Sequence, residues 1–215
     1  MSELLLRTMI GVLLALFALV AAVIGGYLFA GLLALAACVM FYEWRRLVAG
    51  WGFGWQAAGF AYALAPAIAL LWIRDRYLVE GVGMGVELLL WVFIATWSVD
   101  IGAYFAGRTI GGPKLAPAIS PNKTWSGLIG GMAAATLFGG LWAWLLHLPD
   151  ALLWFAAPFA LAAQGGDLFE SWLKRRAGVK DSGSWLPGHG GALDRLDGLV
   201  VVAVLTAVAS SSGVI

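Results

Sequence analysis

The chain has 215 residues, of which 62% are hydrophobic and 12% are charged, with a formal net charge of +1 at pH 7. This composition excludes a soluble globule built around one core, because an aqueous surface needs many more polar residues. The small net charge gives no case for a nucleic-acid partner. We therefore expect an all-α, polytopic integral membrane protein with a single domain over residues 1–215.

Apolar runs of roughly 17 to 22 residues, the length that crosses a hydrocarbon core, predict about seven transmembrane helices. A Gly25-Gly26 pair separates the first two runs, and Pro149-Asp150 separates the fifth from the sixth. The first run resembles a signal sequence in length, but further apolar segments follow it, so we assign it as the first span. The expected spans lie near residues 5–24, 27–46, 57–73, 86–107, 126–147, 151–172 and 198–214.

The lysine and arginine residues predict how these spans are oriented, because cationic loops stay in the cytoplasm. Only Arg74 and Arg76 fall on one side of the seven-span arrangement. The other side is therefore predicted to be cytoplasmic, with the N-terminus inside and the C-terminus outside. We assign Arg45 and Arg46 to this orientation signal alone. The cations on the predicted cytoplasmic side are Arg7, Arg45, Arg46, Arg108, Lys114, Lys123, Lys174, Arg175, Arg176, Lys180 and Arg195.

Asp100, late in the fourth expected span, is the first candidate for chemistry. On a helix it shares a face with Ala103, Tyr104 and Gly107, so the carboxylate would stand over a groove left by small side chains. A carboxylate near the membrane interior is costly and usually faces a polar cavity, which favours a functional role. The small residues by themselves are equally typical of close helix packing.

The segment from Arg108 to Thr124 is the second candidate, and its three prolines exclude a continuous helix. Ser120, Lys123 and Thr124 lie just before the fifth apolar run, where a helix N-terminus offers free amide groups. Two hydroxyl groups, a lysine and these amides together favour an anion-binding site. The alternative is a helix cap followed by a lysine that only sets orientation. A long ordered loop in so apolar a chain favours function over that alternative.

A polar stripe at the end of the sixth run is the third candidate. Asp167, Glu170, Ser171 and Lys174 recur at helical spacing, so they share one face from membrane depth to the cytoplasm. Polar side chains at this depth usually line a cavity, because lipid cannot satisfy them.

Asp194 and Asp197 follow at the start of the last span, after the glycine-rich residues 187–191. Acidic residues at a helix start are sometimes only caps. Together with Asp167 they would also form an oxygen-rich site for Mg²⁺, which is usually shared with substrate phosphates. His189 lies between glycines, where it would either donate to a phosphate or only support the loop.

These polar blocks resemble the signature of the phosphatidate cytidylyltransferase family, also called CDP-diacylglycerol synthases. The longest match runs from Ser171 to Asp197 with the spacing S-x-L-K-R-x4-K-D-x-G-x2-L-P-G-H-G-G-x2-D-R-x-D. Three shorter blocks agree with it, D-x-x-A-Y-x-x-G-R, S-P-N-K-T-x-x-G and G-D-L-x-E-S-x-x-K, and they begin at Asp100, Ser120 and Gly166. A match of this length and polarity is specific.

The resemblance covers about residues 98–198, the expected catalytic half, and implies that CTP and phosphatidic acid give CDP-diacylglycerol and pyrophosphate in phospholipid biosynthesis. It also implies Mg²⁺, with a second cation left open, a homodimer, and an active site on the cytoplasmic face of the cell's inner membrane. The implied catalytic residues are Lys123, Asp167, Lys174, Asp194 and Asp197, with the three aspartates as metal ligands. The residues expected to contact substrate are Asp100, Ser120, Lys123, Thr124, Glu170, Ser171, Arg175, Lys180, Asp181, His189, Gly190, Gly191 and Arg195.

Two departures from the family pattern are Ser126, where many members have an acid, and Ala192, where they have a larger aliphatic residue. The chain is also shorter than many members. Two other functions stay open: a CTP-dependent lipid kinase, which would release CDP, and a transporter with Asp100, Asp167 and Glu170 on an ion path. These acids cluster at the cytoplasmic ends of their spans and the sequence shows no repeat, which favours the synthase.

Overall fold

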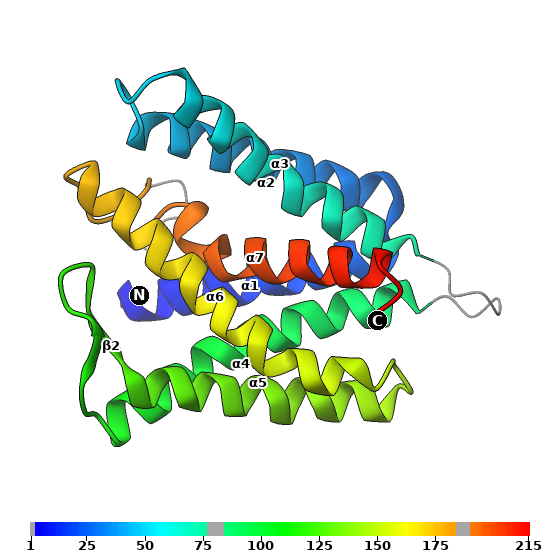
Figure 1. The fold of residues 1–215 in the computed structure, drawn as a ribbon. Coiled ribbons are helices and arrows are strands. Elements are labelled where there is room, and N and C mark those ends of the chain that lie inside the picture. The colour runs from blue at the N-terminus through cyan, green and yellow to red at the C-terminus, as the bar shows by residue number, and fades with distance from the viewer. Residues whose placement is uncertain (1–2, 77–83, 184–189) are drawn as a thin grey trace.

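The computed structural model describes residues 3–76, 84–183 and 190–215, and these residues form seven helices and one short β hairpin (Figure 1). The helical architecture predicted from the sequence is confirmed, whereas the hairpin is an addition to it. The helices are α1 (Glu3–Ile24), α2 (Gly26–Leu47), α3 (Phe53–Arg74), α4 (Gly85–Thr109), α5 (Trp125–Leu145), α6 (Ala151–Arg176) and α7 (Leu193–Ser211). The strands are β1 (Lys114–Ala116) and β2 (Ser120–Thr124).

Five of the described helices, α2 to α6, are long and apolar enough to cross a membrane. The part of α1 whose side chains the structure describes, Met9–Ile24, is apolar as well. The first turns of α7 carry Asp194, Arg195 and Asp197, so its charge keeps it out of this group. A membrane protein is therefore supported, while seven spans and the orientation of the N-terminus stay predictions.

Of the helices that extend beyond the predicted spans, α6 and α7 matter for the candidate site. α6 continues past residue 172 to Arg176, and α7 begins at Leu193 instead of near residue 198. In both places the helix continues from an apolar run into charged residues. Hydropathy detects only the apolar run, so the predicted helix ends there and misses the charged turns. The extensions bring the charged residues of the third candidate onto rigid helix ends.

Helices α4 and α5 form the most extensive helix pair in the bundle. A Cβ atom added to Gly102 would lie 2.6 Å from the backbone oxygen of Gly130, and one added to Gly130 would lie 2.2 Å from the Cβ of Ala106. Such close approach through glycine is typical of helix pairs in membranes. For Gly102, close packing is therefore the correct interpretation of the small residues that follow Asp100.

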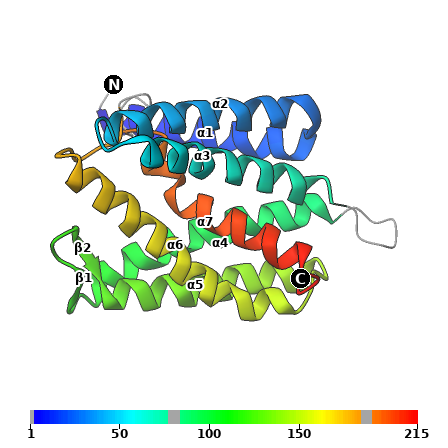
Figure 2. The same ribbon diagram turned by 45° about the horizontal axis from the view of Figure 1, so that its top comes forward.

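The C-terminal end of α3 lies at the end of the bundle away from the hairpin (Figures 1 and 2). Arg74 is the last residue of α3 and Arg76 follows it, and these are the two cations predicted to lie outside the cytoplasm. Arg74 donates from Nε to the carbonyl oxygen of Ala22 at 3.3 Å and from Nη2 to that of Val23 at 3.1 Å. Arg76 Nη1 donates to the backbone oxygen of Ile215 at 3.4 Å. Both arginines thus satisfy carbonyl groups beyond the reach of intrahelical amides.

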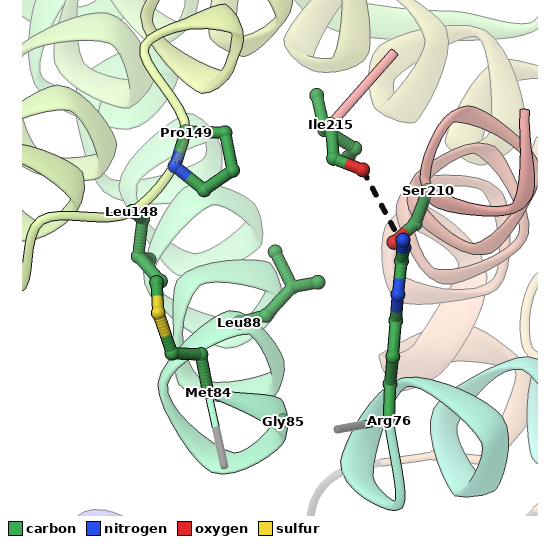
Figure 3. Close-up of a pocket in the computed structure, with 8 residues that line it drawn as sticks. All are labelled: Arg76, Met84, Gly85, Leu88, Leu148, Pro149, Ser210 and Ile215. Carbon is green, nitrogen blue, oxygen red and sulfur yellow. Dashed lines mark hydrogen bonds between the residues drawn. The ribbon is translucent and has the colours of Figure 1, made fainter. Parts of the chain in front are cut away.

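A small cavity at this end lies between α4, α7 and the segment before α6 (Figure 3). Met84, Leu88 and Leu148 line it, and the Arg76 guanidinium borders it beside Ile215. Its volume is about 20 Å³, which is room for about one water molecule. This cavity is therefore too small for a substrate.

Candidate active site

The β hairpin places Lys123 at the N-terminus of α5. Strands β1 and β2 are antiparallel, with Lys114 opposite Thr124. Thr124 is the N-cap of α5, because its Oγ1 accepts a hydrogen bond from the amide of Gly127 at 3.1 Å. The predicted helix start is confirmed. Since Thr124 is buried and already bonded, it holds the hairpin on the helix rather than offering a free hydroxyl.

Ser126 ties the base of the hairpin to the end of α4. Its hydroxyl donates to the backbone oxygen of Gly111, and it also lies 3.0 Å from Thr124 Oγ1. Ser126, one of the two departures from the family pattern, therefore contacts both the end of α4 and the N-cap of α5.

Lys123 reaches from β2 to α6, where its ammonium group contacts a carboxylate and an amide. It forms an ion pair with Asp167 and donates to Gln164 Oε1 at 2.8 Å. The Lys123 side chain is 16% exposed and that of Asp167 is 31% exposed, so the lysine is largely withdrawn from water while the aspartate stays partly open. Asp167 also accepts a hydrogen bond from Ser171 at 3.3 Å. Gln164 was not among the predicted site residues, although it lies three positions before Asp167 on the same stripe.

A cavity of about 560 Å³ opens between α4, α5, α6 and β2. This volume falls within the roughly 300–1,000 Å³ that is common for small-molecule sites. Four predicted residues line it: Asp100, Lys123, Thr124 and Asp167. The lining also includes Ala103, Tyr104, Gly107, Arg108, Asn122, Gly127, Leu128 and Gln164. Tyr104 accepts a hydrogen bond from Arg108 at 3.2 Å, so a cation and a phenol stand together on the α4 wall.

Negative charge is concentrated where α4, α6 and α7 meet. The carboxylates of Asp100, Asp167 and Asp197 lie near enough to repel one another, and Lys123 and Arg195 partly offset this repulsion. Within residues 3–76, 84–183 and 190–215, no three Asp, Glu, His or Cys side chains could hold a metal ion by themselves. A metal ion here would need further oxygen atoms from substrate and water, as Mg²⁺ usually takes at phosphate sites.

Asp194 belongs to a second, enclosed group of polar side chains. Its Oδ1 accepts a hydrogen bond from Lys174 at 2.5 Å, and its Oδ2 accepts from the amides of Gly191 at 2.8 Å and Ser182 at 3.0 Å. Lys174 also pairs with Glu170 Oε2 at 3.2 Å, and its side chain is 11% exposed. Lys174 therefore joins α6 to α7 through two carboxylates. We call Glu170, Lys174, Ser182 and Asp194 the enclosed network.

The predicted metal ligands are thus divided between two regions. Asp167 lines the cavity, and Asp197 lies close enough for the two carboxylates to repel each other. Asp194 is directed into the enclosed network, where three protein donors converge on its Oδ2. The first two carboxylates fit a cation shared with phosphates, whereas Asp194 fits one less well. Magnesium itself stays a prediction.

Arg175 connects the end of α6 to the hairpin. Its Nε donates to the backbone oxygen of Ile119 at 3.3 Å, and its Nη1 donates to that of Val179 at 3.2 Å. Ser120 pairs with Ala116 in the same hairpin. Arg175 is therefore positioned to hold the hairpin over the cavity, a role that its place in the motif did not indicate.

Lys180 and Asp181 follow α6 in an exposed turn. His189 lies outside the described residues, so its predicted role is open. A Cβ atom added to Gly190 would lie 3.0 Å from Asp194 Oδ2, which leaves little room for a side chain there. The charge of Arg195 acts on Asp100.

Glu43, on α2, was not predicted as a site residue. It is completely buried and accepts hydrogen bonds from the amides of Ala192 and Leu193 at the start of α7. The available signal was an acid in an otherwise apolar helix. Its partners, however, are far away in the sequence.

Comparison with known proteins connects this geometry to a family. A sequence model of the cytidylyltransferase family matches residues 54–212, which include every residue that lines the large cavity. The chain belongs to the cytidylyltransferase family. The predicted resemblance is confirmed, and the match extends beyond the residues on which the prediction was based.

Several cytidylyltransferase relatives carry the name phosphatidate cytidylyltransferase. One from Brucella suis is 46% identical over 184 residues, which cover 84% of this chain and 62% of the relative. One from Haemophilus influenzae is 40% identical over 150 residues, covering 65% of this chain and 52% of the relative. One from Rickettsia bellii is 44% identical over 125 residues, covering 54% of each. The matched part is thus less than two thirds of the length of these relatives.

Proposed function

We propose that this protein transfers the cytidylyl group of CTP to phosphatidic acid and thereby forms CDP-diacylglycerol and pyrophosphate. The observation that carries the proposal is the large cavity, which combines Lys123, Arg108, Asp100 and Asp167 at one end of an apolar helix bundle. A site in this place is accessible both to a lipid headgroup and to a soluble nucleotide. The names of the relatives agree with this chemistry.

The reaction requires no nucleophile from the protein. A phosphate oxygen of phosphatidic acid forms a bond to the α-phosphorus of CTP, the bond from that phosphorus to the bridging oxygen breaks, and pyrophosphate leaves. The enzyme must therefore position two anionic substrates and neutralise their charge. Lys123 and Arg108 provide positive charge on the cavity wall.

Lys123 has the geometry for a phosphate contact. A lysine ammonium group has three donor positions. Its contacts with Asp167 and Gln164 use two of them, and a phosphate oxygen would take the third. Asp167 and Gln164 thereby fix the direction in which this charge points.

We also propose Mg²⁺ as the cofactor, held by Asp167 and Asp197 together with phosphate oxygens. Bound Mg²⁺ neutralises charge on the phosphates and on the leaving pyrophosphate. The mutual repulsion of the carboxylates at this point supports a cation there. Binding of Mn²⁺, followed by electron paramagnetic resonance in the wild type and in Asp167→Asn, tests this site without an activity assay.

The position of the label decides between synthase and kinase. Purified protein in detergent receives Mg²⁺, CTP labelled on either the α- or the γ-phosphate, and either phosphatidic acid or diacylglycerol, whose free hydroxyl a lipid kinase would phosphorylate. We expect the α-label in a lipid product and the γ-label in pyrophosphate. A γ-label in the lipid would establish the kinase instead, and no transfer by folded protein would reject both. The same assay on Asp167→Asn gives the background.

We further propose that the cavity faces the cytoplasm from the inner membrane and that the protein is a homodimer. Asp150 and Lys180 are exposed at opposite ends of α6. In a Cys38→Ala background, a cysteine at position 150 should react with an impermeant thiol reagent added outside, and one at position 180 only after the membrane is opened. The reverse pattern would invert the orientation. Native mass spectrometry of the detergent complex reports the number of copies.

A further inference from the structure

Glu43 brings a carboxylate from α2 to the start of α7. The residue is 0% exposed. Its Oε1 accepts a hydrogen bond from the amide of Ala192 at 3.0 Å, and its Oε2 accepts one from the amide of Leu193 at 2.9 Å. Amides at a helix N-terminus lack an intrahelical acceptor, so a carboxylate there satisfies donors that are otherwise left unpaired. Glu43 thus caps α7 from another part of the chain.

Ser182 connects Glu43 to the enclosed network. Its Oγ lies 3.0 Å from Glu43 Oε2 and 2.9 Å from Asp194 Oδ2. A serine hydroxyl has one proton and donates to one carboxylate at a time. The amide of Ser182 donates to Asp194 at 3.0 Å in addition. One serine therefore relates the positions of the two acids.

Two glycines provide the space that Glu43 occupies. A Cβ atom at Gly183 would lie 2.3 Å from Glu43 Oε1, and one at Gly191 would lie 2.6 Å from both carboxylate oxygens. Both glycines belong to the long polar motif, whereas Glu43 lies outside the residues 54–212 that match the family. A carboxylate outside the motif thus accounts for two glycines inside it.

We propose that Glu43 is a positioning residue of the active site. By holding the first amides of α7 and Ser182, it sets where α7 presents Asp194 to Lys174 and Asp197 to the cavity acids. A buried carboxylate is unfavourable unless it is hydrogen-bonded, so the start of α7 and Glu43 keep each other in place. Glu43 acts through α7, because it accepts hydrogen bonds from Ser182, Ala192 and Leu193, and none of these residues lines the large cavity. Its catalytic effect rests on the proposed function, whereas its effect on α7 does not.

Glu43→Gln tests this proposal while keeping the size of the side chain. The amide NH₂ would face a backbone N–H or the Ser182 hydroxyl, so at least one donor loses its acceptor. We expect kcat to fall by about 10- to 100-fold, the effect of losing a hydrogen bond to a charged group. The KM for phosphatidic acid should change by less than about 2-fold, since substrate contacts remain. The matched control is Glu87→Gln on α4 at the far end of the bundle, which should leave both constants unchanged.

Hydrogen exchange of residues 190–197 provides a readout that does not depend on activity. We expect faster exchange in Glu43→Gln than in the wild type, with no change at the start of α5. Faster exchange with unchanged kcat would make Glu43 an anchor of the fold only and overturn the proposal, and unchanged exchange would overturn it as well. If the wild type makes no CDP-lipid, the proposed function fails, and the exchange result alone decides whether Glu43 positions α7.

Gly183→Ala applies the same test from the loop side, in case Glu43→Gln does not insert and fold. The added methyl group would displace the Glu43 carboxylate. We expect the same fall in kcat and the same faster exchange. Wild-type behaviour of Gly183→Ala would overturn the proposal.

Discussion

Lys123 and Lys174 each pair with an aspartate at the same end of the bundle, but their surroundings differ. Lys123 borders a cavity of about 560 Å³ and shares Asp167 with few other donors. Lys174 is enclosed between Glu170 and Asp194, and Asp194 also accepts hydrogen bonds from two backbone amides. The first lysine is placed to add a ligand contact to its two protein contacts. The second is placed to hold two helices together.

The acceptor capacity of the two aspartates explains this difference. An ionised carboxylate has about four acceptor positions. Asp194 contacts Lys174, Gly191 and Ser182, so protein donors fill most of its positions. Asp167 contacts Lys123 and Ser171 and faces the cavity, so it has capacity left for a cation. Similar residue types in one motif can therefore serve binding and architecture side by side.

The largest effect should come from Asp167→Asn, which removes a charge from the cavity region. Loss of a hard oxygen ligand and of the partner of Lys123 should lower turnover by about three orders of magnitude or more. The thermal transition in detergent should change little, because Asp167 is partly open to the cavity. Turnover of CTP at saturating phosphatidic acid is the measurement, with exposed Asp150→Asn as the control. Normal turnover would remove Asp167 from the site.

Lys174→Met should mainly lower stability, whereas Asp167→Asn mainly lowers turnover, because Lys174 belongs to the enclosed network. Removing one partner of a buried ion pair leaves Glu170 and Asp194 without their cation, which typically costs about 3–5 kcal/mol. The free energy of unfolding in detergent should fall by about this amount, and Lys123→Met should lower it much less. A variant with wild-type stability and poor CTP binding would place Lys174 among the phosphate ligands instead.

Much of the fold could be predicted because it depends on local patterns. The apolar runs locate the helices, and the Gly25-Gly26 pair does separate α1 from α2. The hairpin was not predicted, because β1 has three residues and β2 contains Pro121, so neither shows a clear strand pattern. Its existence depends on packing against α5 and α6.

The candidate site could be predicted only as a set of residues. The sequence identified Asp100, Lys123 and Asp167, and the structure brings all three to one cavity. It could not separate Lys123 from Lys174, because the aspartates that pair with them, Asp167 and Asp194, lie far from each lysine in the sequence, and only the tertiary neighbours distinguish the two. Glu43 was missed for the same reason, since its partners lie about 150 positions further along the chain.

Lys123→Ala tests whether the cavity lysine contacts a substrate phosphate. Loss of a charge-assisted phosphate contact, worth roughly 1.5–3 kcal/mol, should raise the KM for CTP or lower kcat by about 10-fold or more. Arg46→Ala should leave both nearly unchanged, because the Arg46 guanidinium lies over the Tyr42 ring on its own helix. Initial rates at varied CTP concentrations give the comparison. Equal small effects in two folded variants would mean that the SPNKT segment only starts its helix.

Gly130→Ala should have the smallest effect on catalysis, because it acts behind the cavity wall rather than on a polar group. The added methyl group would meet Ala106 at 2.2 Å and the Gly102 oxygen at 3.0 Å, so α4 and α5 must move apart. Overpacking of this kind costs about 1–3 kcal/mol, measured as a lower free energy of unfolding in detergent. Gly165→Ala on α6 is the matched control, because an added Cβ meets nothing within 4 Å there. The exchange of residues 190–197 should not change in either variant, since the enclosed network lies on α6, α7 and the segment between them. Faster exchange there in Gly130→Ala would show that movement of the cavity wall reaches the enclosed network, and the cavity and the network would then not be independent.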